Sequence, residues 1–278
     1  MNRIPQLLLM AFFLAGCTFA VAQQPAATPA QTGRHIPQAK THQEFNDYNT
    51  AYALTGGPQV EGAAQEFERK YPSSELKVYL YAKALHEYQN EQNTGKMLIV
   101  GRKIIEIDPD NTIALVLTST VLADALRTED SDRQKKVDEI KKDAVHALDT
   151  VDSAFTPPAN ATPEQITAYK KTLQSMAHSA LGITALKTDD NIIAERELKL
   201  AAELNVTQPD PYIWYHLALA QDHQKKYSEA LDSVNHALQI MGANADLGNL
   251  AKGEQGRLLT LTGGPASSQD KVPAQPPK

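Results

Sequence analysis

Apolar residues recur at intervals of three and four along residues 43–262, where Ala, Leu, Glu, Lys and Gln dominate. That interval places apolar side chains on one face of an α-helix, whereas a half-buried strand would show strict alternation. The dominant residue types also have high helix propensity. The pattern therefore predicts an all-α body whose helices each bury one apolar stripe.

The clearest segment is residues 211–240, with the sequence PYIWYHLALAQDHQKKYSEALDSVNHALQI. It predicts two short helices that are separated at residues 225–228, with Ser228 as the N-cap of the second. Each helix carries one apolar stripe, and an antiparallel hairpin buries both. The stripes consist of Trp214, Leu217 and Ala218 in the first helix and Ala230, Val234, Ala237 and Leu238 in the second.

This spacing resembles the tetratricopeptide repeat (TPR), a helical hairpin of about 34 residues with fixed large and small positions. With Pro211 as position 1, the matching residues are Trp214, Leu217, Ala218, Ala230, Val234 and Ala237. Positions 11 and 32, usually Tyr and Pro, are Gln221 and Gly242. A preceding unit fits from Ser175, so the clearest repeats are residues 175–208 and 211–244. The resemblance implies an α-solenoid, in which stacked hairpins form a right-handed superhelix with a concave face.

Earlier units match less well. Ile104 and Pro109 fit positions 27 and 32, which places Tyr88 at position 11, but Gly101 then occupies position 24, where a large apolar residue is usual. Residues 110–174 form one oversized unit, in which a charged helix from about residue 132 to 151 is followed by a helix from Pro163. Residues 243–263 are expected to form a capping helix. An irregular helical bundle is the alternative to this repeat architecture.

Residues 1–22 carry one charge, Arg3, before an apolar run that is shorter than the about 20 residues of a membrane span. This layout is typical of an export signal and predicts a periplasmic or cell-envelope protein. Two cleavage sites remain open. Acylation of Cys17, the only cysteine, would follow from the LAGC lipobox, whereas cleavage before Gln23 would remove it. Residues 23–42 are expected to be a flexible linker and residues 263–278 a disordered tail.

The formal net charge is −6, and the densest basic stretch, residues 133–142, is interleaved with acidic residues. A nucleic-acid partner is therefore not expected, because phosphate binding needs concentrated Lys and Arg. The only partial metal motif is residues 86–90, which begins like HExxH but ends in Asn90. The sequence contains no recognisable catalytic, cofactor-binding or metal-binding constellation, so we expect no enzymatic activity and no cofactor.

The remaining candidate function is the binding of a partner through the protein surface. In the TPR family, positions 2, 5, 9, 12 and 13 of the first helices line the concave groove. The resemblance therefore implies a groove with apolar and aromatic side chains, which suits an apolar or extended peptide. Packing on a neighbouring helix, or simple exposure to solvent, fits the same residues equally well. The implied residues are Tyr212, Tyr215, Leu219, Asp222 and His223 in the last repeat and Ile183 and Lys187 in the one before, with Tyr79, His86 and Asn90 as an extension.

The expected function is a non-enzymatic protein–protein interaction scaffold of the cell envelope, with another protein or a peptide segment as its partner. Membrane association would occur only through an acyl group on Cys17. The alternative is an accessory subunit or ligand carrier for an envelope enzyme, with a pocket in the irregular unit near residues 150–180.

Overall fold

The computed structural model describes residues 37–158, 160–205, 208–242 and 245–263. The expected leader, Cys17, most of the linker and nearly all of the tail lie outside these residues. The described chain is helical and contains no strand, as the apolar periodicity predicts. The helices are α1 (His42–Tyr52), α2 (Gly57–Lys70), α3 (Lys77–Asn90), α4 (Thr94–Ile107), α5 (Thr112–Ala125), α6 (Arg133–Ala154), α7 (Pro163–Lys187), α8 (Asn191–Leu204), α9 (Pro211–His223), α10 (Tyr227–Ile240) and α11 (Ala245–Leu261).

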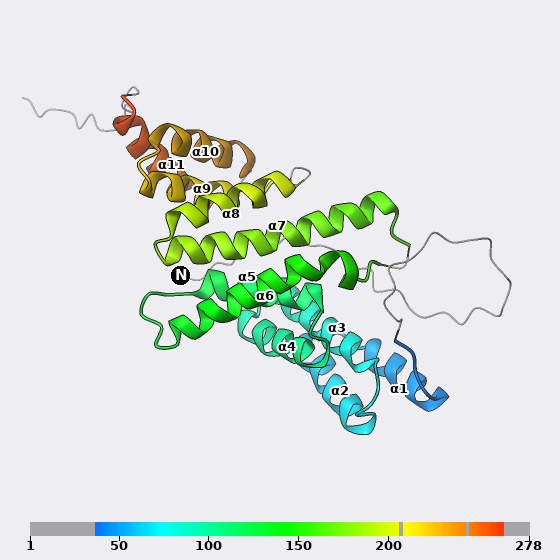
Figure 1. Ribbon diagram of the computed structural model, residues 1–278. Coiled ribbons are helices and arrows are strands. Elements are labelled where there is room, and N and C mark those ends of the chain that lie inside the picture. Colours follow the sequence, from blue (N-terminus) through cyan, green and yellow to red (C-terminus); the bar gives the residue numbers. More distant parts are fainter. Residues whose placement is uncertain (1–36, 159, 206–207, 243–244, 264–278) are drawn as a thin grey trace, which may run out of the picture. The chain divides into compact units, whose positions relative to one another are not determined.

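The helices follow one another as antiparallel hairpins (Figure 1). Successive helices from α1 to α6 pack against one another, and so do those from α8 to α11. The chain divides into two compact units between Leu181 and Gly182, inside α7. Unit 1 contains α1–α6 and most of α7, and unit 2 contains the end of α7 and α8–α11. The fold is a series of TPR-like helical hairpins, while the right-handed superhelix stays a prediction.

Three hairpin turns share one backbone geometry. Gln92, Asp189 and Lys225 have φ values of 54°, 63° and 62°, in the left-handed region. In each turn the next residue donates its N–H to a carbonyl five residues back: Asn93 to Tyr88, Asp190 to Ala185 and Lys226 to Gln221. These bonds close the first helix as in a Schellman motif. The left-handed residue falls at position 15 of all three repeats, so the turns independently support the register that the apolar pattern predicts.

The first hairpin turns through a glycine in a different backbone conformation. Gly56 has φ of 84° and ψ of 131°, and α2 begins at the next residue. Its N–H donates to Glu87 Oε2 at 3.0 Å, and the N–H of Gly57 donates to Glu91 Oε1 at 2.7 Å. Two carboxylates from the end of α3 therefore satisfy backbone donors at the start of α2, where the helix dipole favours negative charge.

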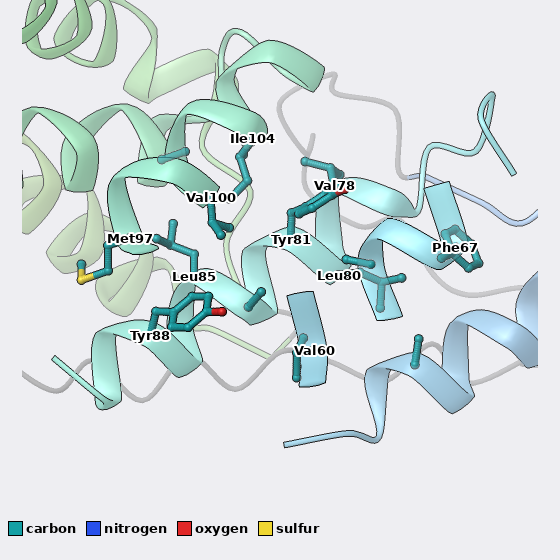
Figure 2. Packing of buried hydrophobic residues seen from close by; sticks show 14 of the residues in the cluster. Val60, Phe67, Val78, Leu80, Tyr81, Leu85, Tyr88, Met97, Val100 and Ile104 are labelled. Atoms are coloured by element: carbon teal, nitrogen blue, oxygen red, sulfur yellow. The ribbon is translucent and has the colours of Figure 1, made fainter. Parts of the chain in front are cut away.

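The core of unit 1 lies between α2, α3 and α4 (Figure 2). Tyr88 is 1% exposed, and its ring lies so close to Gly57 that a methyl group there would overlap ring carbon Cε1. Its hydroxyl donates to Glu61 Oε2 at 2.5 Å, and the same oxygen accepts from Lys96 Nζ at 2.8 Å. The buried hydroxyl and carboxylate are thereby paired, as a low-dielectric interior requires.

Two departures from the repeat pattern have local explanations. Gly101 stands where a large residue is usual because Thr118 of α5 approaches it, and a methyl group on Gly101 would overlap Thr118 Oγ1. The α5–α6 connection spans residues 126–132 and lacks the tight turn of the other hairpins. α7 begins at Pro163, where the sequence places a helix start, and its length makes this the most irregular part of the array.

One capping prediction was wrong. Ser228 lies inside α10, which begins at Tyr227 after the N-cap residue Lys226, and no side chain caps this end. The Lys226 N–H closes the tight turn, and α10 begins directly after it at Tyr227. Ser228 is therefore already helical and cannot take the non-helical conformation of an N-cap residue. The final helix, α11, buries Leu247 and Leu258, at 1% and 0% exposure, in unit 2.

Candidate protein-binding surface

The first-helix face of unit 2 is only partly open. Tyr212, Tyr215 and Leu219 of α9 are half-buried. The Tyr215 ring packs against a cluster that includes Ala218, Val234 and Leu258, and burial raises the pKa of its phenol. One edge of Tyr215 therefore belongs to the core of unit 2, and the rest of its surface is open.

Asp222 and His223 already have partners inside the protein. Asp222 forms an ion pair with Arg257 of α11, which also pairs with Glu254 at 2.8 Å. Hydrogen bonds to Glu254 and Asp222 raise the pKa of the Arg257 guanidinium. His223 Nδ1 lies 3.1 Å from Asn191 Oδ1 at the start of α8. A ligand that used either side chain would have to share it with these contacts.

The two candidates from α7 differ in exposure. Ile183 is 6% exposed and contributes to packing, whereas Lys187 is partly exposed. Burial and the positive charge of Lys187 lower the pKa of His216 to about 4, so His216 is neutral at pH 7. The imidazole of His216 therefore adds no charge to the surface near Lys187.

The corresponding face of unit 1 is more open. Asn46 and Thr50 of α1 and Leu54 just after it are exposed. On α3, Tyr79 and His86 are partly exposed and Asn90 is exposed. We use the name α1–α3 face for two sets of residues: the exposed Gln43, Asn46 and Thr50 of α1 with Ala53 and Leu54 after it, and Tyr79, Ala82, His86, Gln89 and Asn90 at positions 2, 5, 9, 12 and 13 of the α3 repeat.

The α1–α3 face carries no formally charged residue. Two charged residues of α3 next to it neutralise one another, because Lys83 Nζ lies 3.0 Å from Glu87 Oε1 and also over the ring of Tyr52. His86 Nε2 lies 3.3 Å from the Asn90 amide nitrogen. The surface is thus a row of amides, hydroxyls and aromatic rings, groups that donate and accept hydrogen bonds without charge.

Sequence reasoning named Tyr79, His86 and Asn90 but missed α1. The first hairpin lacks most of the large and small residues of the repeat pattern, so its register cannot be read from apolar spacing alone. Gly56 marks the turn into α2, but its ψ of 131° differs from the left-handed helical geometry of the other turns, so it does not set a repeat register for α1.

The region of residues 150–180 was the expected location of a pocket in the alternative function. Among its described residues, Val151, Phe155, Leu173 and Ala177 pack in one apolar cluster. In the described ranges no three His, Cys, Asp or Glu side chains gather as metal ligands. No helix of the described chain has the length and apolar character needed to cross a bilayer.

No protein-family model matches the chain, and no curated protein matches it. Among solved structures, it is similar to a thermophilic TPR protein from Thermus thermophilus, with a TM-score of 0.45 and 16% sequence identity. The similarity covers 76% of this chain and 98% of that chain.

Proposed function

We propose that this protein is a non-enzymatic scaffold that binds an uncharged, extended segment of a partner polypeptide along its first-helix faces. The observation that carries the proposal is the α1–α3 face, which stays open while the apolar stripes of the same hairpins are buried. Asn46 and Asn90 present hydrogen-bonding groups to solvent, and Tyr79 and Leu54 add apolar area.

Side chains of this kind suit a peptide backbone. An extended segment exposes N–H and C=O groups that amides and hydroxyls can satisfy, and aromatic side chains supply contact area at low entropic cost. A strongly charged partner would gain little here, because the face has no charge to complement it. Tyr212 and Leu219 of unit 2 offer a second, smaller surface of similar character.

The proposal places the protein in the cell envelope because residues 1–22 have the layout of an export signal. Intact-mass measurement of the exported protein distinguishes the two cleavage sites. A chain that begins at Gln23 excludes the lipid anchor, and an acylated chain that begins at Cys17 excludes simple removal of the leader. An unprocessed mass in the cytoplasm would overturn the envelope location.

Site-specific photo-crosslinking in intact cells tests the binding surface. A photoreactive residue replaces Asn46 or Asn90 on the α1–α3 face, and Glu66 or Arg69 on α2 serves as the matched control. The control side chains are 77% and 75% exposed, so accessibility does not favour the face under test. We expect a discrete adduct with a second polypeptide from Asn46 and Asn90 only. Adducts of equal yield from α2, or none from α1 and α3, would contradict the proposal.

A further inference from the structure

Helix α6 is joined to the preceding hairpin by two polar contacts on one face. Arg102 of α4 donates through Nε and Nη2 to the two carboxylate oxygens of Glu139, at 2.5 and 2.8 Å. Seven residues further along α6, His146 Nε2 lies 2.8 Å from Asp110 Oδ1, in the α4–α5 turn. We call the surface between these two contacts the α4–α6 seam.

Asp143 lies between Glu139 and His146 on the same face, because residues three and four apart are neighbours on a helix. It is 4% exposed, and its side chain has no hydrogen bond or ion pair with any residue that the structure describes. Its helix neighbour Ala144 belongs to an apolar cluster against which Ile105 of α4 packs. The carboxyl group is thus held in a poorly solvated position with no dedicated partner.

The surroundings of Asp143 favour its protonated form. Burial and the negative charge of Glu139 raise the pKa of Asp143 to about 6, against the opposing charges of Lys142, Arg102 and His146. The titratable and charged groups that face it are Glu139, Lys142 and His146 from α6, Arg102 from α4 and Asp110 from the α4–α5 turn.

We propose that the α4–α6 seam is a proton-operated clasp, which holds α6 more firmly against the α4 hairpin as the medium becomes acidic. Protonation removes the charge of Asp143, which is buried beside Glu139 with no ion-pair partner of its own in the described chain. This inference concerns regulation of the fold and does not depend on the proposed function.

The direction of this pH dependence follows from the linkage between proton binding and folding. The ordinary pKa of Asp143 is 3.8 and the folded protein raises it, so the folded state binds the proton more tightly. The free-energy cost of burying an ionised Asp143 is fully present above about pH 6, and it is relieved as the pH falls toward 4. The seam is therefore weakest at neutral and alkaline pH.

Hydrogen exchange of the full-length protein at pH 7.5 and pH 5.5 tests the clasp, with opening constants corrected for intrinsic exchange chemistry. We expect opening of α6 around residues 139–150 to become at least about threefold less frequent at pH 5.5 in the wild type. Asp143→Asn should be protected at both pH values. Asp149→Asn, on the same helix, is the control and should respond like the wild type.

An unchanged pH response in Asp143→Asn, or looser packing of α6 at pH 5.5, would overturn the proposal. Should Asp143→Asn fail to fold, NMR titration of the side-chain carboxyl carbons in the wild type decides the matter. A midpoint above 5 for Asp143 supports the clasp, and a midpoint near 4 refutes it.

Discussion

Gly101 of α4 faces Thr118 of α5 so closely that a methyl group on the glycine would overlap the threonine Oγ1. Thr118 is 1% exposed, and its Oγ1 has no hydrogen-bond partner in the described chain. Neither the hydroxyl nor the backbone around it can move into solvent, so this contact sets how near two hairpins approach.

Gly101→Ala is therefore expected to lower the free energy of unfolding by about 1–3 kcal/mol, because overpacking outweighs the gain in helix propensity. Chemical denaturation measures the change. Gly62→Ala is the matched control, since a methyl group on this α2 glycine meets no atom within 4 Å, and it should stabilise by about 1 kcal/mol. Adding Thr118→Ala to Gly101→Ala should recover most of the loss. If the stability effects of Gly101→Ala and Thr118→Ala simply add, the two side chains are not in contact.

Lys225→Gly is expected to stabilise unit 2 by a few tenths to about 1 kcal/mol, because a left-handed conformation strains an L-residue and not glycine. The gain stays modest because glycine also increases the entropy of the unfolded chain. Lys252→Gly, in the exposed right-handed backbone of α11, should destabilise by about 1 kcal/mol. Thermal melts of the two variants should move in opposite directions, and a fall for both would contradict the turn assignment.

Tyr215→Ala is expected to lower the free energy of unfolding by about 1–2 kcal/mol, because the ring packs partly against Ala218 and Leu258. The TPR resemblance by itself implies a groove position for this residue. Ile192→Ala should change stability little, since that side chain is 74% exposed. If the wild type and Tyr215→Ala were equally stable, Tyr215 would contribute only to the surface and not to the core of unit 2.

Glu195 should make unit 2 sensitive to acid. Its burial opposes ionisation, but hydrogen bonds from Lys199, Lys226 and Gln224 lower its pKa to about 2. The ionised group stabilises the fold above its ordinary pKa of 4.5, and this contribution is lost as the pH falls toward 2.

Glu195→Gln is expected to destabilise the protein by about 1–3 kcal/mol at pH 7, since its charge-assisted hydrogen bonds are weakened. The difference from the wild type should shrink between pH 5 and pH 3, as followed by denaturant midpoints. Glu203→Gln, on the same helix, controls for net charge. A difference that stays constant with pH would exclude this role for Glu195.

The part of the fold that the sequence predicts best is the hairpin of residues 211–240, because both of its helices carry complete apolar stripes. Local patterns such as these fix which face of each helix is buried. The approach of Gly101 to Thr118 could not be predicted, since it depends on how one hairpin sits on the next.

Only part of the candidate surface could be predicted, because local patterns define the faces of a helix but not the packing between hairpins. Tyr79 and Asn90 follow from the register of α3, which Tyr88 and Ile104 define. The exposed side chains of α1 could be identified only from the burial of the opposite face of that helix, and the contact between Asp222 and Arg257 only from the packing of α11 within unit 2.

The shared turn at Gln92, Asp189 and Lys225 makes the three hairpins that contain it equivalent as building blocks. Each enters and leaves its turn along the same backbone path, so a whole hairpin can be duplicated or deleted without disturbing the internal bonds of its neighbours. A protein built in this way can change its length in evolution by steps of one hairpin, while insertions of a few residues are confined to the connections, as in residues 126–132.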